Sequence, residues 1–326
     1  MPEITLVEAV NLALARAMAE DERVVVLGED VGRDGGVFRA TLGLVDRFGP
    51  QRVRDTPLAE AAIAGLSVGL AAEGFRPVAE IQFDGFMFPT IDQMVNHAAR
   101  LRTRTRGRLT CPMVLRAPYG GGIHAPEHHS DSVETFFAHI PGLRVVIPSS
   151  PRRAYGLLLA AIRDPDPVVF LEPKRLYRLS RETVEDDGAA LELDTCFMLR
   201  DGGDVTLVAW GAMIVEALAA ADLLASEGIE AAVLDVATLT PLDATPILRS
   251  VTTTGRCVIA HEAPLTGGFG GEIAARVAEG ALLSLLAPVR RVTGYDCMMP
   301  LPRLEGHYLP GAERIAAAAR EVMSYR

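Results

Sequence analysis

Three of the seven histidines of the chain lie within six positions, in a segment that begins with three consecutive glycines. They are His124, His128 and His129 of the stretch GGGIHAPEHHSDS. Imidazole titrates near pH ~6.5 and also binds metals, so an acid–base site, a zinc site and a solvated loop are all open. His124 and His128 have the spacing of a helical zinc pair, but Pro126 between them opposes a helix. We therefore expect no zinc, and we expect His124 and His128 to be solvated.

Glu60 is a second residue that can do chemistry, in the stretch DTPLAEAAIAGLSVGLAAEG. Asp55 or Thr56 can cap a helix that carries Pro57 in its first turn. Glu60 then lies in the first turn, where the helix dipole favours a carboxylate. The residues alone leave two roles open, a carboxylate that only complements the dipole and a catalytic acid–base group.

The composition excludes several classes of protein. Lys174 is the only lysine, so no Gly-Lys pair for a P-loop exists, and a Schiff base can form at that residue alone. The net charge of −10 opposes binding to nucleic acid or to an anionic membrane. No apolar run approaches the ~18–20 residues of a membrane span. The four cysteines form no CxxC pair and the first residues lack a basic leader, so we expect reduced thiols and a bacterial cytoplasmic protein.

Short apolar runs alternate with helical periods along the chain, which predicts parallel sheets covered on both faces. A polar, irregular stretch interrupts this alternation and predicts an inter-domain linker at 181–203. The fold class is therefore α/β with two doubly wound domains, at 1–180 and 204–326. Strands are predicted at 23–28, 77–83, 112–117, 143–148, 167–171, 205–210, 231–236, 256–261 and 289–292. Helices are predicted at 5–19, 58–74, 89–104, 151–163, 212–227, 243–251, 271–286 and 313–324.

Two stretches that contain candidate site residues directly follow predicted strands. Phe83, Phe86 and Phe88 crowd the end of the strand at 77–83, and the histidine segment follows the strand at 112–117. The carboxyl ends of parallel strands lie at one edge of the sheet, and ligands of such sheets bind at that edge. We therefore expect a ligand site there, although ordinary core packing remains an alternative for Phe86.

A series of segments along the chain reads VVVLGEDVG, DTPLAE, AEIQF, EHHSDSVETFFAHIPGLRVVIPSSP, AIRDPDPVVFLEPKRLYR, VTLVAWG, HEAPLTGGFGGEI and GYD. In this order the segments resemble the beta subunit of the thiamine-diphosphate-dependent decarboxylating component of 2-oxo acid dehydrogenase complexes. The resemblance covers nearly the whole chain, and the branched-chain enzymes are the most similar because of EIQF, FLEPKRLYR and HEAPLTGGF.

The resemblance implies a transketolase-like pyrimidine-binding domain followed by a transketolase C-terminal domain. It also implies an assembly of two alpha and two beta chains, with each thiamine diphosphate bound between an alpha and a beta subunit. Related enzymes hold the diphosphate and its magnesium with a Gly-Asp-Gly segment, which this chain lacks. We therefore expect the alpha subunit to supply that half of the cofactor site and most of the magnesium ligands.

The resemblance also assigns roles to single residues. Glu60 matches the glutamate that hydrogen-bonds N1′ of the aminopyrimidine, and Phe86 matches the aromatic residue that stacks on this ring. Branched-chain relatives tend to carry tyrosine at the Phe86 position. Gln82 is expected beside the cofactor. His129, which precedes Ser130, matches the active-site histidine that moves protons during acyl transfer to the lipoyl group.

Family members hold a structural potassium ion with main-chain carbonyl oxygens, which suit a hard cation. Asp166 departs from the asparagine that is common among relatives, and a plain helix end followed by turns is the alternative for this region. The matching positions are Met113, Ala161, Ile162, Asp164 and Asp166.

The function that the resemblance implies is oxidative decarboxylation of a 2-oxo acid and reductive acylation of a lipoyl group. The expected partners are the alpha subunit, a second beta subunit, and the dihydrolipoyl acyltransferase with its lipoyl and subunit-binding domains. Pyruvate and acetoin dehydrogenases are the alternatives for the substrate. An alternative of another class is a non-catalytic scaffold subunit, which would have no need for both Glu60 and His129.

Overall fold

The computed structural model describes residues 3–325, which form two compact units. Unit 1 comprises residues 3–119 and 128–193, and unit 2 comprises residues 120–127 and 194–325. The segment 120–127 thus belongs to unit 2, although its neighbours in sequence on both sides belong to unit 1. Among residues 3–325, none of the helices has the length and apolar character that a membrane crossing requires.

The region 181–203, where we expected a linker, contains two strands. β8 (Glu182–Thr183) pairs with β1 (Glu3–Ile4) in unit 1, and β9 (Phe197–Arg200) pairs with β11 (Ala231–Asp235) in unit 2. The units meet in sequence at residues 193 and 194. The region where we expected the linker thus contains two short strands, and the boundary between the two units falls inside it.

A parallel sheet forms the centre of unit 1, with the strand order β6-β7-β5-β4-β2-β3. Its inner strands are buried almost throughout, as their apolar runs predict for a sheet covered on both faces. No apolar run predicted β3, because only Val53 of its three residues is buried. The strands are β2 (Val24–Gly28), β3 (Val53–Asp55), β4 (Arg76–Glu80), β5 (Val114–Tyr119), β6 (Arg144–Val146) and β7 (Val168–Pro173).

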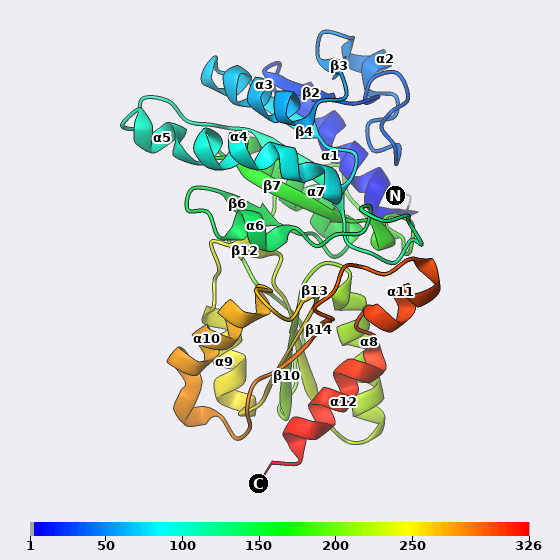
Figure 1. Cartoon of the computed structure of the whole chain (residues 1–326), viewed down its shortest axis with the longest axis vertical. Helices are drawn as coiled ribbons and strands as arrows, with labels where there is room; N and C mark the ends of the chain where they lie inside the picture. Colours follow the sequence, from blue (N-terminus) through cyan, green and yellow to red (C-terminus); the bar gives the residue numbers. More distant parts are fainter. Residues whose placement is uncertain (1–2, 326) are drawn as a thin grey trace. The chain divides into compact units, whose positions relative to one another are not determined.

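Helices follow the strands of unit 1 in sequence. α1 packs against α7, and α3 packs against α4, beside which it lies in Figure 1. The helices are α1 (Leu6–Glu20), α2 (Leu44–Phe48), α3 (Glu60–Ala72), α4 (Ile91–Asn96), α5 (Leu101–Arg104), α6 (Glu134–Ala138) and α7 (Pro151–Arg163), with 3-10 turns η1 (Asp84–Thr90), η2 (Ala98–Arg100) and η3 (Lys174–Leu176).

The single helix predicted at 89–104 is wrong, because this region consists of η1, α4, η2 and α5. Two guanidinium groups bond main-chain carbonyls at the break. Arg100 Nε donates to the carbonyl oxygen of Val95 at 3.0 Å, and Arg104 Nη2 donates to that of Asn96 at 2.8 Å. In a continuous helix those oxygens accept from the amides four residues ahead. These two side chains thus compete with main-chain amides for carbonyl oxygens in the middle of the predicted helix.

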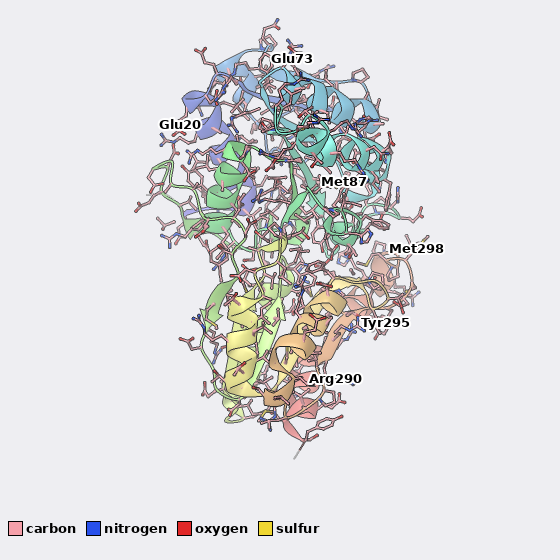
Figure 2. All side chains as sticks on the ribbon, turned by 90° about the vertical axis from the view of Figure 1, so that its left-hand side faces the viewer. Glu20, Glu73, Met87, Arg290, Tyr295 and Met298 are labelled. Carbon is pink, nitrogen blue, oxygen red and sulfur yellow. The ribbon has the colours of Figure 1, made fainter. Side chains whose placement is uncertain are left out.

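Unit 2 has a second sheet with the strand order β14-β13-β10-β11-β9, parallel except for the edge strand β9. Figure 1 shows α9 and α10 on one side of β10 and β13, and α8 and α12 on the other. Tyr295 and Met298, labelled in Figure 2, lie exposed between β14 and α11. The elements are β10 (Val205–Ala209), β12 (Thr238–Thr240), β13 (Cys257–Pro264), β14 (Arg290–Gly294), α8 (Met213–Ser226), α9 (Thr245–Thr254), α10 (Gly270–Ala281), η4 (Leu282–Ser284), α11 (Pro302–Tyr308) and α12 (Ala312–Met323).

A buried ionic cluster joins the three central strands of unit 1. Arg116 of β5 is 1% exposed and donates to both carboxylate oxygens of Glu172 on β7, at 2.7 Å each. It also pairs with Glu80 on β4. Tyr177 donates to Glu172 at 2.6 Å, and burial raises the pKa of this phenol well above its usual range. Two buried carboxylates thus depend on one guanidinium and one phenol.

Replacing Arg116 should therefore destabilise the chain strongly. We expect Arg116→Met to lower the free energy of unfolding by about 3–5 kcal/mol, because two carboxylates lose their buried counter-charge. Urea denaturation followed by circular dichroism measures this loss. Arg163→Met is the matched control, since the pair of Arg163 with Glu20 is 41% exposed on both sides and should contribute at most about 1 kcal/mol. Equal losses for the two variants would contradict the assignment.

Candidate active site

The strand order of unit 1 reverses direction between β2 and β4. The chain passes from β2 to β3 on one side and then returns to β4 on the other side of β2. At such a switch point the loops after the two strands diverge and leave a crevice outside their carboxyl ends. Glu29 follows β2 directly, and Gln82 and Phe83 follow β4. The topology therefore places the candidate site at this edge of the sheet.

Glu60 is the first residue of α3, so its place in the first helical turn is confirmed. The predicted capping by Asp55 or Thr56 is wrong, because the residue before the helix is Ala59 and makes no side-chain cap. The Asp55 carboxylate instead accepts from the amide of Gly32 at 2.7 Å. Because Glu60 begins α3, it stands at the positive end of the helix dipole. Glu73 follows the last residue of the same helix and lies at the surface (Figure 2).

Glu29 lies close enough to Glu60 for the two carboxylates to interact. Its side chain is 6% exposed, and among the described residues no hydrogen-bond partner reaches its Oε1. Burial raises the pKa of Glu29 above its usual range, and the charges of Glu60 and Asp30 raise it further. One carboxyl of the pair thus has a raised pKa, while the other stands at a helix start.

Aromatic rings surround His129. Its ring centroid lies 4.5 Å from that of Phe83 and 5.1 Å from that of Phe86, both in edge-on arrangements. Phe83 and Phe86 are 5.9 Å apart and also edge-on. The structure therefore brings the predicted residues Phe86 and His129 together, from the loops after β4 and β5. Edge-on packing against two rings restricts the orientation of the imidazole.

Lys174 lies beneath this ring cluster. Its Nζ is 2.7 Å from Oδ2 of Asp84, and both side chains are completely buried. The same ammonium lies 5.6 Å from the ring centroid of Phe83. A buried, ion-paired ammonium is a poor nucleophile, so the single lysine serves here as a support for the loop after β4 and not as a Schiff-base amine.

The two other histidines of the segment bond to different carboxylates. His128 Nδ1 lies 3.2 Å from Oδ2 of Asp131, and its ring stacks on that of Phe88. His124 Nδ1 lies 2.9 Å from Oε2 of Glu305, while the side chain of His124 stays 72% exposed. Within residues 3–325, no group of three or more His, Cys, Asp or Glu side chains is arranged to hold a metal ion.

His261 is the histidine most removed from solvent. It is fully buried beside Trp210 in unit 2, and burial lowers its pKa to about 4. It is therefore neutral at physiological pH and packs as a flat ring. This contrast leaves His129, which is half-buried at the sheet edge, as the acid–base candidate.

Two of the carbonyl groups expected to bind potassium converge on an arginine. Arg76 Nη1 donates to the oxygens of Ile162 and Asp164, at 2.8 and 3.2 Å, beyond the last turn of α7. The carbonyl of Met113 accepts the amide of Val168 at 2.9 Å. The Asp166 carboxylate pairs with Arg102 at 2.7 Å. A carbonyl oxygen has two lone pairs, so these contacts leave acceptor capacity for a cation.

Sequence reasoning missed the carboxylates of Glu262 and Glu305. Both are almost completely buried in unit 2 and accept hydrogen bonds from the glycine-rich segment before His128. They lie more than 130 positions further along the chain, so no local sequence pattern predicts their hydrogen bonds with the glycine-rich segment. The only signal was the glycine run itself, which indicates a close approach of main chain to another group.

Two family models match the chain. The transketolase pyrimidine binding domain matches residues 2–180, and the transketolase C-terminal domain matches residues 195–315. A solved split-gene transketolase, described as an inactive beta4 tetramer, superposes with a TM-score of 0.82 over 99% of both chains at 24% identity. The expected fold class is therefore confirmed.

Three curated relatives span nearly the whole chain. The pyruvate dehydrogenase E1 component subunit beta of Acholeplasma laidlawii is 48% identical over all of both chains. The 3-methyl-2-oxobutanoate dehydrogenase subunit beta of Mycobacterium tuberculosis is also 48% identical, over 98% of this chain and 92% of the relative. The 2-oxoisovalerate dehydrogenase subunit beta of Bacillus subtilis is 44% identical over all of both chains.

The raised pKa of Glu29 predicts a pH-dependent stability. The folded chain keeps this proton at pH values at which the unfolded chain has released it, so stability falls as the pH rises from the usual carboxyl range through the folded pKa. Glu29→Gln cannot ionise, so the variant should become progressively more stable than the parent over that range. The difference should level off above the folded pKa.

Urea denaturation of both chains from about pH 4 to about pH 8 measures this difference. Glu73→Gln is the matched control, because it removes an exposed carboxylate at the other end of α3. Parallel stability curves for the parent and Glu29→Gln would show that the Glu29 carboxyl is not perturbed in the folded chain.

Proposed function

Because the chain belongs to the beta subunits of the thiamine-diphosphate-dependent E1 component of 2-oxo acid dehydrogenases, we propose that Glu60, Phe86 and His129 form its half of the active site. The supporting observation is their placement along one sheet edge, with Phe86 and His129 in contact. The bound cofactor supplies the carbanion chemistry of decarboxylation. This chain has no Gly-Asp-Gly segment, so the alpha subunit completes the site and holds most of the magnesium ligands.

The residues present fit the aminopyrimidine end of the cofactor. Glu60 accepts or donates a proton at N1′, and Phe86 presents an aromatic face for stacking. Gln82, which is half-buried just after β4, would contact the same ring. The buried oxygen of Glu29, which no described donor reaches, supports a polar partner at this crevice. The pKa of Glu29 is raised by burial and by the charge of Glu60 beside it, so the two carboxyls of the crevice interact.

His129 is the proton-transfer residue of the second half-reaction. Contacts with Phe83 and Phe86 hold its ring, and its side chain is partly exposed to solvent, from which a lipoyl group would arrive. During acyl transfer a proton must reach a dithiolane sulfur, and an imidazole is suited to deliver it near neutral pH.

We propose a branched-chain 2-oxo acid as the substrate. The segments EIQF, FLEPKRLYR and HEAPLTGGF support this choice. Pyruvate is the second candidate, because a pyruvate and a 3-methyl-2-oxobutanoate dehydrogenase subunit are both 48% identical to the chain. Acetoin remains a third. The rings of Phe83 and Phe86, whose centroids are 5.9 Å apart at the sheet edge, offer apolar contacts to a branched aliphatic side chain.

The proposed assembly is a heterotetramer of two alpha and two beta chains in the bacterial cytoplasm, which acylates the lipoyl domain of a dihydrolipoyl acyltransferase. We also propose a structural potassium ion near the C-terminal end of α7. The carbonyl oxygens of Ile162 and Asp164 lie close to one another there, since both accept from Nη1 of Arg76. Carbonyl oxygens in the last turn of a helix and just after it lack intrahelical partners and suit a hard cation.

Reconstitution tests the proposed function. The chain alone should show no decarboxylase activity and only weak binding of thiamine diphosphate, and the alpha subunit should restore both. Within the assembled enzyme, kcat/KM should be at least about 10-fold higher for 3-methyl-2-oxobutanoate than for pyruvate, which corresponds to about 1.4 kcal/mol of transition-state binding. The reverse preference would make this a pyruvate enzyme. Strong magnesium-dependent cofactor binding by the isolated chain would refute the shared site.

Replacing the Glu60 carboxylate isolates its role. In the assembled enzyme, Glu60→Gln should slow hydrogen–deuterium exchange at C2 of the bound cofactor by about 10²–10⁴-fold, because an amide cannot exchange a proton with N1′. NMR of quenched samples measures this rate. Glu73→Gln, at the other end of the same helix, should leave it unchanged. An unaltered rate in Glu60→Gln would show that Glu60 only complements the helix dipole and takes no part in proton transfer.

The histidine segment gives a graded prediction. His129→Ala should lower acyl transfer to a lipoyl-domain acceptor by roughly 10²-fold or more, as expected for a lost acid–base group. His128→Ala removes the neighbouring ring, which pairs with Asp131, and its rate of acyl transfer should stay within a few-fold of the parent. The same is expected for His124→Ala. Equal losses in all three variants would show that the histidines act as one site.

A further inference from the structure

The first turn of η1 packs directly against the main chain of the residue before His129, within unit 1. A Cβ atom on Gly85 would lie well inside the contact distance of the main-chain carbonyl oxygen of His128. It would also lie 2.8 Å from Oδ2 of Asp131 and 3.0 Å from Nδ1 of His128. The φ of Gly85 is not positive, so the close contact, and not the backbone conformation, requires glycine at this position.

A buried ion pair holds the start of η1 in place. Asp84 is the first residue of η1 and is completely buried. Its Oδ1 accepts the amide of Gly85 at 3.0 Å, and its Oδ2 lies 2.7 Å from Nζ of Lys174, directly after β7. A displacement of Asp84 would leave a buried charge without its partner, which is costly. Gly85 is thus fixed, through one residue, to the end of β7.

The chain on the other side of this contact yields more readily. Residues 128–133 form neither helix nor strand, and the side chain of His128 is 47% exposed. Segments of this kind move at a lower cost in free energy than a buried ion pair. A larger residue at position 85 would therefore displace the main chain of His128. His129 is the next residue, so its imidazole would move away from the rings of Phe83 and Phe86, which it contacts at 4.5 and 5.1 Å between centroids.

We propose that Gly85 is a positioning residue for His129: by letting η1 touch the main chain of His128, it sets the place of the imidazole beside the ring of Phe86. This inference rests on the proposed role of His129 in acyl transfer. Gly85 has no side chain and takes no part in the reaction itself. The pair of Asp84 and Lys174 fixes the surface against which the chain at His128 rests.

NMR of the full chain with Gly85→Ala tests the geometry without any catalysis. In the parent with isotope-labelled histidine, ring currents of Phe83 and Phe86 should shift the Cε1–H resonance of His129, which is assigned by its loss in His129→Ala. In Gly85→Ala this resonance should move toward that of an exposed histidine. The resonance of His261, which is buried in unit 2, should stay in place as an internal reference. An unchanged His129 resonance would overturn the inference.

Kinetics of the assembled enzyme of alpha and beta chains test the consequence. In Gly85→Ala, acyl transfer to a lipoyl domain should fall by roughly 10-fold to 10²-fold, as expected when a reacting group is displaced by about 1 Å. Exchange at C2 of the cofactor should stay within about three-fold, since η1 stays in place and no acid–base group of that step is lost. Gly203→Ala is the matched control, because a Cβ atom at this exposed position would meet no atom within 4 Å. A parallel loss of both rates in Gly85→Ala would indicate general damage and would overturn the inference.

A double-mutant cycle shows whether Gly85 acts through His129 alone. When His129→Ala has already removed the imidazole, the further change Gly85→Ala should lower acyl transfer by less than about two-fold, because no ring remains to be displaced. Losses that add up fully in the double variant would overturn the inference, since Gly85 would then act through other residues.

The outcomes separate this inference from the proposed function. A parent enzyme without acyl transfer, or a His129→Ala variant with full acyl transfer, would refute the proposed role of His129 and with it the role of Gly85. An active parent whose Gly85→Ala variant shows a displaced imidazole but full acyl transfer would overturn the inference alone.

Discussion

The guanidinium of Arg116 holds the carboxyl ends of β4 and β7 on either side of β5. Its two partners, Glu80 and Glu172, are buried at the strand ends from which the loops of the candidate site depart. The loop after β2 depends on the same cluster, since a Cβ on Gly36 would lie 2.7 Å from Oε1 of Glu80. Burial of the charges makes each member depend on the others, which fixes the strand ends more strictly than apolar packing alone.

Two carboxyl groups at the switch-point crevice have unlike surroundings. Glu29 follows a fully buried strand, and burial raises the pKa of its carboxyl. The charge of Glu60, the first residue of α3, raises the pKa of Glu29 further. The crevice therefore holds a carboxyl with a raised pKa beside a second carboxyl at a helix start.

Local patterns predicted the central strands and long helices, because apolar runs and helical periods report burial directly. β3 escaped notice since two of its three residues are exposed. The helix at 89–104 was predicted too long because two arginine side chains bond carbonyls within it, and no periodicity reveals such competition. The contact of Phe86 with His129 followed from both lying after parallel strands. The family resemblance, and not the residues alone, gave Glu60 and His129 their roles.

The carboxylates that hold the glycine run mark the limit of local reasoning. A glycine run predicts close approach but not the group that is approached. Glu262 and Glu305 are buried, at positions where a carboxylate is costly unless N–H donors meet it. Main-chain amides are such donors, and the missing side chains of Gly120 and Gly121 let the chain approach the carboxylates closely. Buried carboxylates and a glycine run far apart in sequence therefore require one another, and neither is explained until the fold brings them together.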